Sequence, residues 1–243
     1  SCGLHTLVRS ICVEEPPVPA FTLSANTGCA PLNVTTTNTT TSPNSCLTTW
    51  QWNMSGTAST CATGPASSST STAFQPSFLF DQPGTYTVQF RAVNSCNVPP
   101  LSQTVTVNAP PQVTVAGLTG ICAGQCVTPS ATVQDCGAPI TNYAWTFPGG
   151  APANANTLTP GQVCFAGAGN PTLSLAVTNA CGTVTSNANL SIGNAPAAPA
   201  ASSNSPVCAG QTISFTANGG AGVTYIWTDP AGNLISTQAA FTI

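Results

Sequence analysis

Apolar and polar residues alternate in short runs along most of this chain. Between Tyr86 and Ala92 every second residue is apolar, and the run from Leu173 to Val177 has a similar pattern. Alternation at a period of two predicts strands that bury one face, and Pro, Gly and Asn between the runs predict turns. No stretch places apolar residues at i, i+3, i+4 and i+7 between helix caps. The pattern therefore predicts an all-β fold built from many short strands.

A pair of aromatic residues, spaced by two and ending in Trp, recurs three times. Both rings of a pair point to the same face of a strand, so we expect them, together with Tyr86, in the cores. The copies are Trp50-Gln51-Trp52, Tyr143-Ala144-Trp145 and Tyr225-Ile226-Trp227. The first two copies are followed by an alternating run that ends in Asn-x-Cys, at Cys96 and Cys181. This recurrence indicates tandem domains of about the length of an immunoglobulin-like sandwich.

The repeats divide the chain into four parts. Ile11 and Val13 stand at the same distances from Cys2 as Val105 and Val107 from Cys96, which predicts a strand there. The parts are 1–19, the C-terminal strands of a preceding repeat; 20–109 and 110–195, two complete repeats; and 196–243, the N-terminal part of a further repeat. These half-repeats favour a segment of a longer chain. The alternative is completion of one molecule's end by the next molecule, which would give head-to-tail fibres.

Charged residues make up only 3% of the chain, and the net charge is −3. The cations are Arg9 and Arg91, and Lys is absent. A nucleic-acid partner needs clustered Lys and Arg to neutralise phosphates, so we expect no nucleic acid, and an anionic membrane surface is disfavoured for the same reason. No apolar run reaches 18 residues, so we expect no membrane insertion. Hydrophobic residues at 42% with a low net charge are the reverse of the disordered signature.

Twelve cysteines with a single His indicate disulfides formed in an oxidising compartment. The spacing Cys122-x3-Cys126 resembles half a zinc site, but no second pair completes it, so we expect no metal. We expect a bond from the first cysteine of each repeat to the one after Asn-x, and further bonds between loops. The expected pairs are Cys29–Cys96, Cys122–Cys181, Cys46–Cys61, and Cys126 with Cys164 or Cys136. Cys2 and Cys208 are expected to pair outside the chain, and Cys12 has no expected partner.

The chain resembles the PKD-type repeat family. Tyr143-Ala144-Trp145-Thr146-Phe147-Pro148-Gly149-Gly150 and Pro83-Gly84-Thr85-Tyr86-Thr87-Val88 are similar to that family's Tyr-x-Trp-Asp-Phe-Gly-Asp-Gly and Gly-Thr-Tyr-x-Val motifs. The resemblance implies tandem immunoglobulin-like sandwiches. The Cys-rich variant is similar to arrays in large cell-surface adhesins of Bacteroidetes, including gliding-motility adhesins exported by type IX secretion. Asn53, Thr146 and Thr228 replace the family's acidic positions, which argues against calcium there.

Catalytic constellations are not evident. Asp81, Asp135 and Asp229 each lie beside turn-forming residues in different loops, where such side chains bond local N–H groups. His5 is the only histidine, and no base accompanies a cysteine nucleophile. A sugar-stacking role for the Trp residues competes with core packing, which the sandwich fold favours. We therefore expect no enzyme activity and no cofactor.

These observations predict a structural or adhesive segment of a long extracellular surface protein, either an adhesin or a filament. Pro-rich junctions and disulfides would make it a semi-rigid stalk. The alternatives are a spacer or carbohydrate-binding arm of a large secreted hydrolase, and a self-assembling extracellular fibre. The expected partners are further repeats of the same chain, surface polysaccharide and other cell-surface proteins. Loops rich in Ser, Thr and Gly, such as 55–75, are where we expect adhesive contacts.

Overall fold

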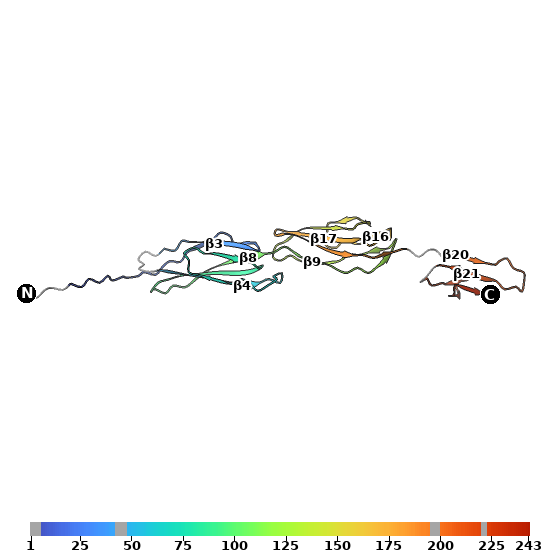
Figure 1. Cartoon of the computed structure of the whole chain (residues 1–243), viewed down its shortest axis with the longest axis horizontal. Coiled ribbons are helices and arrows are strands. Elements are labelled where there is room, and N and C mark those ends of the chain that lie inside the picture. Colours follow the sequence, from blue (N-terminus) through green and yellow to red (C-terminus); the bar gives the residue numbers. More distant parts are fainter. Residues whose placement is uncertain (1–5, 42–47, 195–199, 220–222) are drawn as a thin grey trace, which may run out of the picture.

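A computed structural model describes residues 6–41, 48–194, 200–219 and 223–243, and every regular element in these ranges is a strand. This confirms the all-β prediction. Figure 1 shows two sandwiches placed end to end, with an extended N-terminal stretch before them and a smaller group of strands after them. Among the described residues no helix is long and apolar enough to cross a membrane. Cys2, His5 and Cys46, on which expectations were placed, lie outside the described residues.

The first sandwich consists of a three-stranded and a five-stranded sheet. The smaller sheet has the order β1–β3–β6, formed by Phe21–Leu23, Leu32–Asn38 and Ser77–Phe80. The larger sheet has the order β2–β8–β7–β4–β5, formed by Thr27–Cys29, Leu101–Asn108, Gly84–Val93, Thr49–Ala58 and Ser69–Ser71. β2 runs parallel to β8, and the other pairs are antiparallel. This arrangement places the end of β2 beside the end of β8.

Alternation along the strands fills the core of the first sandwich. On β7 the residues Tyr86, Val88 and Phe90 are fully buried, as the period-two pattern predicts. Trp52 is 2% exposed, and its ring centroid lies 4.2 Å from that of Phe90. The hydroxyl of Tyr86 donates to the Gln82 carbonyl at 2.8 Å, the geometry of a tyrosine corner in immunoglobulin-like domains. The central strands therefore bury aromatic residues on one face.

The second sandwich is built from shorter strands. Its largest sheet has the order β15–β13–β17–β18, formed by Asn154–Ala155, Ile140–Thr146, Thr172–Asn179 and Gly182–Asn189. Smaller sheets pair β12 (Ala131–Gln134) with β9 (Gln112–Val115), and β11 (Cys126–Val127) with β16 (Val163–Phe165) and β14 (Gly150–Ala151). β10 (Ile121–Cys122) runs parallel to β19 (Ile192–Gly193), as β2 does to β8 in the first sandwich. The two sandwiches thus share their parallel edge pair.

The core of the second sandwich repeats that of the first. Trp145 is 1% exposed and stacks on Phe147, with 5.4 Å between ring centroids. Leu173, Leu175 and Val177 on β17 are fully buried. Trp50 and Tyr143, the first residues of their aromatic pairs, are half-buried and pack against the edges of the two cores. The core positions expected for these aromatic residues are therefore largely those found in the structure.

The described N-terminal residues do not form the expected strand. Residues 6–17 have no regular structure, and Ile11 and Val13 are 89% and 77% exposed. None of the described strands pairs with this stretch, so its apolar side chains have no sheet to pack on. Val18 makes an isolated bridge to Thr41 at the edge of the first sandwich.

The C-terminal segment, 200–219 and 223–243, has small sheets but no buried core in its described residues. β20 (Ala200–Ser203), β21 (Ser214–Asn218) and β24 (Ala240–Thr242) form one sheet, and β22 (Trp227–Thr228) pairs with β23 (Leu234–Ser236). Trp227 packs edge-on against Phe215 and Phe241, yet it is only half-buried, as is Tyr225. The core burial expected for this third aromatic pair is not found, because no second layer among the described residues covers it.

Candidate functional site

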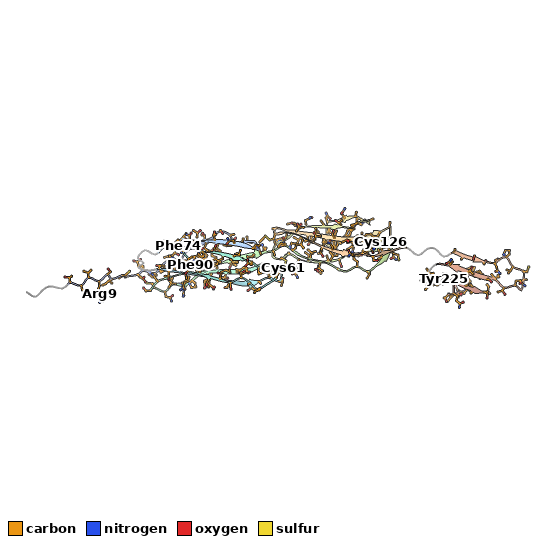
Figure 2. All side chains as sticks on the ribbon, in the orientation of Figure 1. Arg9, Cys61, Phe74, Phe90, Cys126 and Tyr225 are labelled. Carbon is orange, nitrogen blue, oxygen red and sulfur yellow. A yellow bond between two sulfur atoms is a disulfide. The ribbon has the colours of Figure 1, made fainter. Side chains whose placement is uncertain are left out.

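Two disulfides join the first sandwich to the second. Cys29 bonds Cys181 across 152 residues, and Cys61 bonds Cys136 across 75 residues. We call Cys29–Cys181 the outer staple and Cys61–Cys136 the inner staple. Figure 2 shows Cys61 where the two sandwiches meet. In the inner staple Cys61 is 7% and Cys136 is 5% exposed, whereas both cysteines of the outer staple are half-buried.

Three of the expected pairs within single repeats, Cys29–Cys96, Cys122–Cys181 and Cys46–Cys61, are wrong. Cys29 lies beside Asn108 at the end of β8, whereas Cys96 lies in the loop that precedes β8. The eight residues of β8 separate these two ends by about 25 Å, while a disulfide needs Cα atoms within about 7 Å. The expected Cys122–Cys181 bond fails for the same reason, because the two cysteines lie at opposite ends of the second sandwich. The expected Cys46–Cys61 bond is also overturned, since Cys61 bonds Cys136.

The remaining cysteines among the described residues fall into two groups, bonded and free. Cys126 bonds Cys164 within the second sandwich, which is one of the two partners that the sequence left open. Cys12 is also disulfide-bonded. Cys96, Cys122 and Cys208 are free thiols, although the sequence predicted intramolecular bonds for the first two.

The linker between the two sandwiches is short, and hydrogen bonds hold both of its ends. It comprises 109–111 and contains two prolines, which fix the backbone φ and leave few free dihedral angles. The Ala109 N–H donates to the Cys136 carbonyl at 3.1 Å, and the Gln112 side chain donates to the Cys61 carbonyl at 3.3 Å. Each end of the linker is therefore tied to the inner staple. Rotation about the linker would break these bonds and strain both disulfides.

Asn179, the last residue of β17, connects the second sandwich to the linker by hydrogen bonds. It is 4% exposed, and its Nδ2 donates to the carbonyls of Ala109 at 2.8 Å, Asp135 at 2.9 Å and Ala138 at 3.5 Å. Its Oδ1 accepts from the Cys181 N–H at 2.8 Å. One amide thus holds together the linker, the turn that contains Cys136 and the loop that carries Cys181. The Asn of each Asn-x-Cys sequence was predicted to mark a strand end, and this role at the junction was missed.

A turn with unusual backbone geometry positions the inner staple. Cys136 has a φ of 56° and Gly137 a φ of 91°, both in the left-handed region. The Gly137 N–H donates to the Asp135 carboxylate at 3.2 Å, so Asp135 acts as the expected turn residue. A Cβ at Gly137 would lie 2.5 Å from the Asn108 Oδ1, and the residue carrying it would have to adopt the same positive φ, so this position beside the end of β8 favours glycine. The turn therefore lets the two sandwiches approach closely at the staple.

A polar groove of about 860 Å³ crosses the outer face of the five-stranded sheet in the first sandwich. Cross-strand register sets its floor, because Gln51 on β4 faces Arg91 on β7 and Asn53 faces Gln89. The other lining residues are Trp52, Thr70, Ser71, Thr72 and Pro100, so no carboxylate lines the groove. The Arg91 Nε is buried, and no described residue accepts a hydrogen bond from it. The groove thus combines amides and hydroxyls with one cation.

The Asp229 carboxylate serves a local turn in the C-terminal segment. Asn233 donates to both carboxylate oxygens of Asp229, at 2.8 Å from its side chain and 2.8 Å from its backbone N–H. These bonds, the side-chain bond first, lower the pKa of Asp229. The described ranges contain no group of three or more His, Cys, Asp or Glu that could hold a metal ion.

Comparison with known proteins concerns the fold. No family model matches, and no curated protein matches. A structure of the four N-terminal Ig domains of Dscam1, isoform 7.44, aligns with 77% of this chain and 48% of that chain, at 12% identity and a TM-score of 0.40. The fibronectin(III)-like modules of CbhA from Clostridium thermocellum align with 72% of this chain and 95% of that chain, at 13% identity and a TM-score of 0.29.

The chain spans about half the length of the Dscam1 chain that it matches. At such identities the likeness concerns tandem Ig-like and fibronectin-like β-sandwiches and nothing finer. The disulfides, together with sandwich domains of this type, indicate a secreted or extracellular protein.

Proposed function

We propose that this chain is a non-catalytic stalk segment of a long extracellular surface protein, an adhesin or filament. The observation that carries the proposal is the pair of staples across one short linker. Two covalent bonds and a proline-rich connection leave the two sandwiches little freedom to rotate relative to one another. Repetition of such junctions would give a semi-rigid rod that transmits force.

The surface chemistry supports the same role. A chain with 3% charged residues has little charge for salt to screen, so its packing should be insensitive to ionic strength. The disulfides resist chain separation under load and protease attack on opened states. The resemblance to PKD-type repeats of type IX-secreted adhesins suggests further repeats of the same chain as neighbours.

Immunogold electron microscopy of the producing cells tests this proposal. Antibodies raised against the 1–243 polypeptide should label projections outside the cell, spaced along extended particles. Label confined to the cytoplasm, or to a compact secreted enzyme, would overturn the proposal. The intact mass of the native protein separates the alternatives: a catalytic domain next to this segment favours the hydrolase arm, whereas polymerisation of a short native chain favours the fibre.

A second candidate function is contact with an acidic polysaccharide, and the groove favours it. Amides and hydroxyls on the floor and walls match sugar hydroxyls, and Arg91 supplies the cation for a uronate carboxylate or a sulfate. The unpaired Nε of Arg91 leaves a donor that such an anion would satisfy.

Binding of polygalacturonate to the 1–243 polypeptide, with its methyl ester as the neutral control, tests this contact. We expect binding of the acid form that weakens at least tenfold in Arg91→Gln and is weak for the ester. Equal binding of the two polymers, or no effect of Arg91→Gln, would exclude the groove as an anionic saccharide site.

A further inference from the structure

The free thiol Cys122 occupies the same place in the second sandwich as Cys29 does in the first. Cys29 ends β2 and lies beside Asn108 of the parallel strand β8. Cys122 ends β10 and lies beside Gly193 of the parallel strand β19. The following residue makes the same bond in each case: the Ala30 N–H donates to the Asn108 carbonyl at 2.8 Å, and the Ala123 N–H to the Gly193 carbonyl at 2.9 Å. Both cysteines therefore stand where the chain leaves a sandwich.

The free thiol Cys96 corresponds in the same way to Cys181. Each follows an Asn whose Oδ1 accepts the cysteine N–H, at 3.0 Å from Asn94 and 2.8 Å from Asn179. The Nδ2 of each Asn donates at 2.8 Å to a carbonyl of the incoming chain, Glu15 for Asn94 and Ala109 for Asn179. Both cysteines therefore stand where the chain enters a sandwich, beside residues that precede its first strand.

The two sets differ in their disulfide bonding: the Cys29–Cys181 bond joins an exit position to the next entry position, while Cys122 and Cys96, which are half-buried as well, are free thiols. We propose that Cys122 and Cys96 are attachment points for further repeats of this type. Cys122 bonds the cysteine of an Asn-x-Cys entry loop, and Cys96 bonds an exit cysteine at the end of a β2-like strand. This inference rests on the proposed stalk function and extends it to a continuous ladder of outer staples.

Formation of each attachment is a two-electron oxidation. The Cys122 thiol and the partner thiol lose two protons and two electrons as the S–S bond forms. An incoming disulfide, carried by a thiol–disulfide oxidoreductase of the oxidising compartment, accepts them and leaves as two thiols. The partner repeat can lie in the same chain or in a second molecule, since the junction geometry is the same in both cases.

Peptide mapping of the native protein tests the inference. Free thiols are blocked with N-ethylmaleimide as the protein is extracted, and the protein is digested without reduction and mapped by mass spectrometry. We expect the Cys122 peptide linked to a peptide containing Asn-x-Cys, and the Cys96 peptide linked to a peptide with a repeat-start cysteine. Either cysteine recovered as its maleimide adduct, or the two bonded to cysteines of another kind, would overturn the inference.

The same map distinguishes failure of the ladder from failure of the stalk. If Cys29 is bonded to Cys181 while Cys122 carries maleimide, the ladder falls but the stapled junction stands. If the Cys29–Cys181 peptide is missing, the stalk proposal fails as well. Loss of high-mass species on reduction identifies a partner in a second molecule, and unchanged mass identifies one in the same chain.

A variant in the native gene provides the second readout. Cys122→Ser should abolish the linked Cys122 peptide and leave the Cys29–Cys181 peptide intact, because Cys122 takes no part in that junction. The matched control is Cys126→Ser with Cys164→Ser, which removes a bond inside the same sandwich and should leave the Cys122 linkage unchanged. A Cys122→Ser protein whose linkage pattern is identical to the wild type would contradict the inference.

Discussion

When the chain is stretched from its two ends by single-molecule force spectroscopy, the staples should make the contour length of the oxidised protein shorter than that of the reduced protein. The outer staple encloses 152 residues, and these cannot extend while the bond is intact. A fully extended chain spans about 3.5 Å per residue, so the enclosed stretch amounts to about 530 Å. We therefore expect the reduced protein to reach a final contour length about 530 Å greater than the oxidised protein.

Variants assign that length to particular bonds. Cys29→Ser with Cys181→Ser opens the outer staple, but Cys61–Cys136 and Cys126–Cys164 still shorten the path between positions 29 and 181, so the gain in that stretch is only about 200 Å. Cys126→Ser with Cys164→Ser is the matched control, because its bond lies wholly inside the outer staple and its removal should add no length.

Either of two results would refute this reasoning. The first is an oxidised wild-type protein that already extends to the length of the reduced protein. The second is a control variant that gains as much length as the outer-staple variant. The first would mean that no disulfide limits the extension, and the second that a bond inside a single repeat limits it as much as the junction bond does. The chain-entropy model gives loops of 152 and 75 residues a stabilisation of about 4–5 kcal/mol each, so the reduced protein should also unfold at a lower denaturant concentration.

Three further predictions concern the sandwiches and their turns. In urea unfolding, Trp52→Phe should lower the free energy of unfolding by about 1–2 kcal/mol more than Trp145→Phe does. The reason is that the Trp52 Nε1 donates at 3.0 Å to a carbonyl, whereas the buried Trp145 Nε1 has no acceptor among the described residues. A larger loss for Trp145→Phe would contradict this prediction. Asn179→Ala should cost about 2–4 kcal/mol in urea unfolding, since it removes the buried amide that donates to three junction carbonyls, and a loss below about 0.5 kcal/mol would show that water replaces the amide. Hydrogen bonds from Asn233 lower the pKa of Asp229 in the folded turn, so the turn should keep its full stability above the ordinary carboxyl pKa and lose this contribution as the pH falls through the lowered pKa of Asp229. In an NMR titration, Asn233→Ala should raise the pKa of Asp229. An unchanged pKa would show that Asn233 is not the cause of the shift.

Local patterns in the sequence predicted the strands and most of the core. Alternation places Val88 and Leu175 inward by the geometry of a strand alone, and the aromatic pairs mark the central strands. The same reasoning failed for Trp227, because burial requires a second layer and the segment's described residues supply only one. It failed for Ile11 and Val13 in the same way.

Disulfide pairing could not be predicted in this way, because it depends on which strand ends meet in space. The sequence shows that Cys29 and Cys96 belong to one repeat, but not that the parallel β2–β8 pair sends Cys29 to the exit end. A signal was present: each Asn-x-Cys lies just before the strand that leads out of its repeat. The groove was likewise beyond sequence reasoning, because the cross-strand register that brings Arg91 opposite Gln51 is a property of the sheet.

The central claim is that two staples make the first and second sandwiches a single rigid unit. Backbone ¹⁵N relaxation of the oxidised 1–243 polypeptide tests it most directly, since it reports how each sandwich tumbles. We predict one rotational diffusion tensor shared by both sandwiches, which separates into two when both staples are replaced by serine pairs. Independent tumbling of the two sandwiches in the oxidised protein would contradict the account.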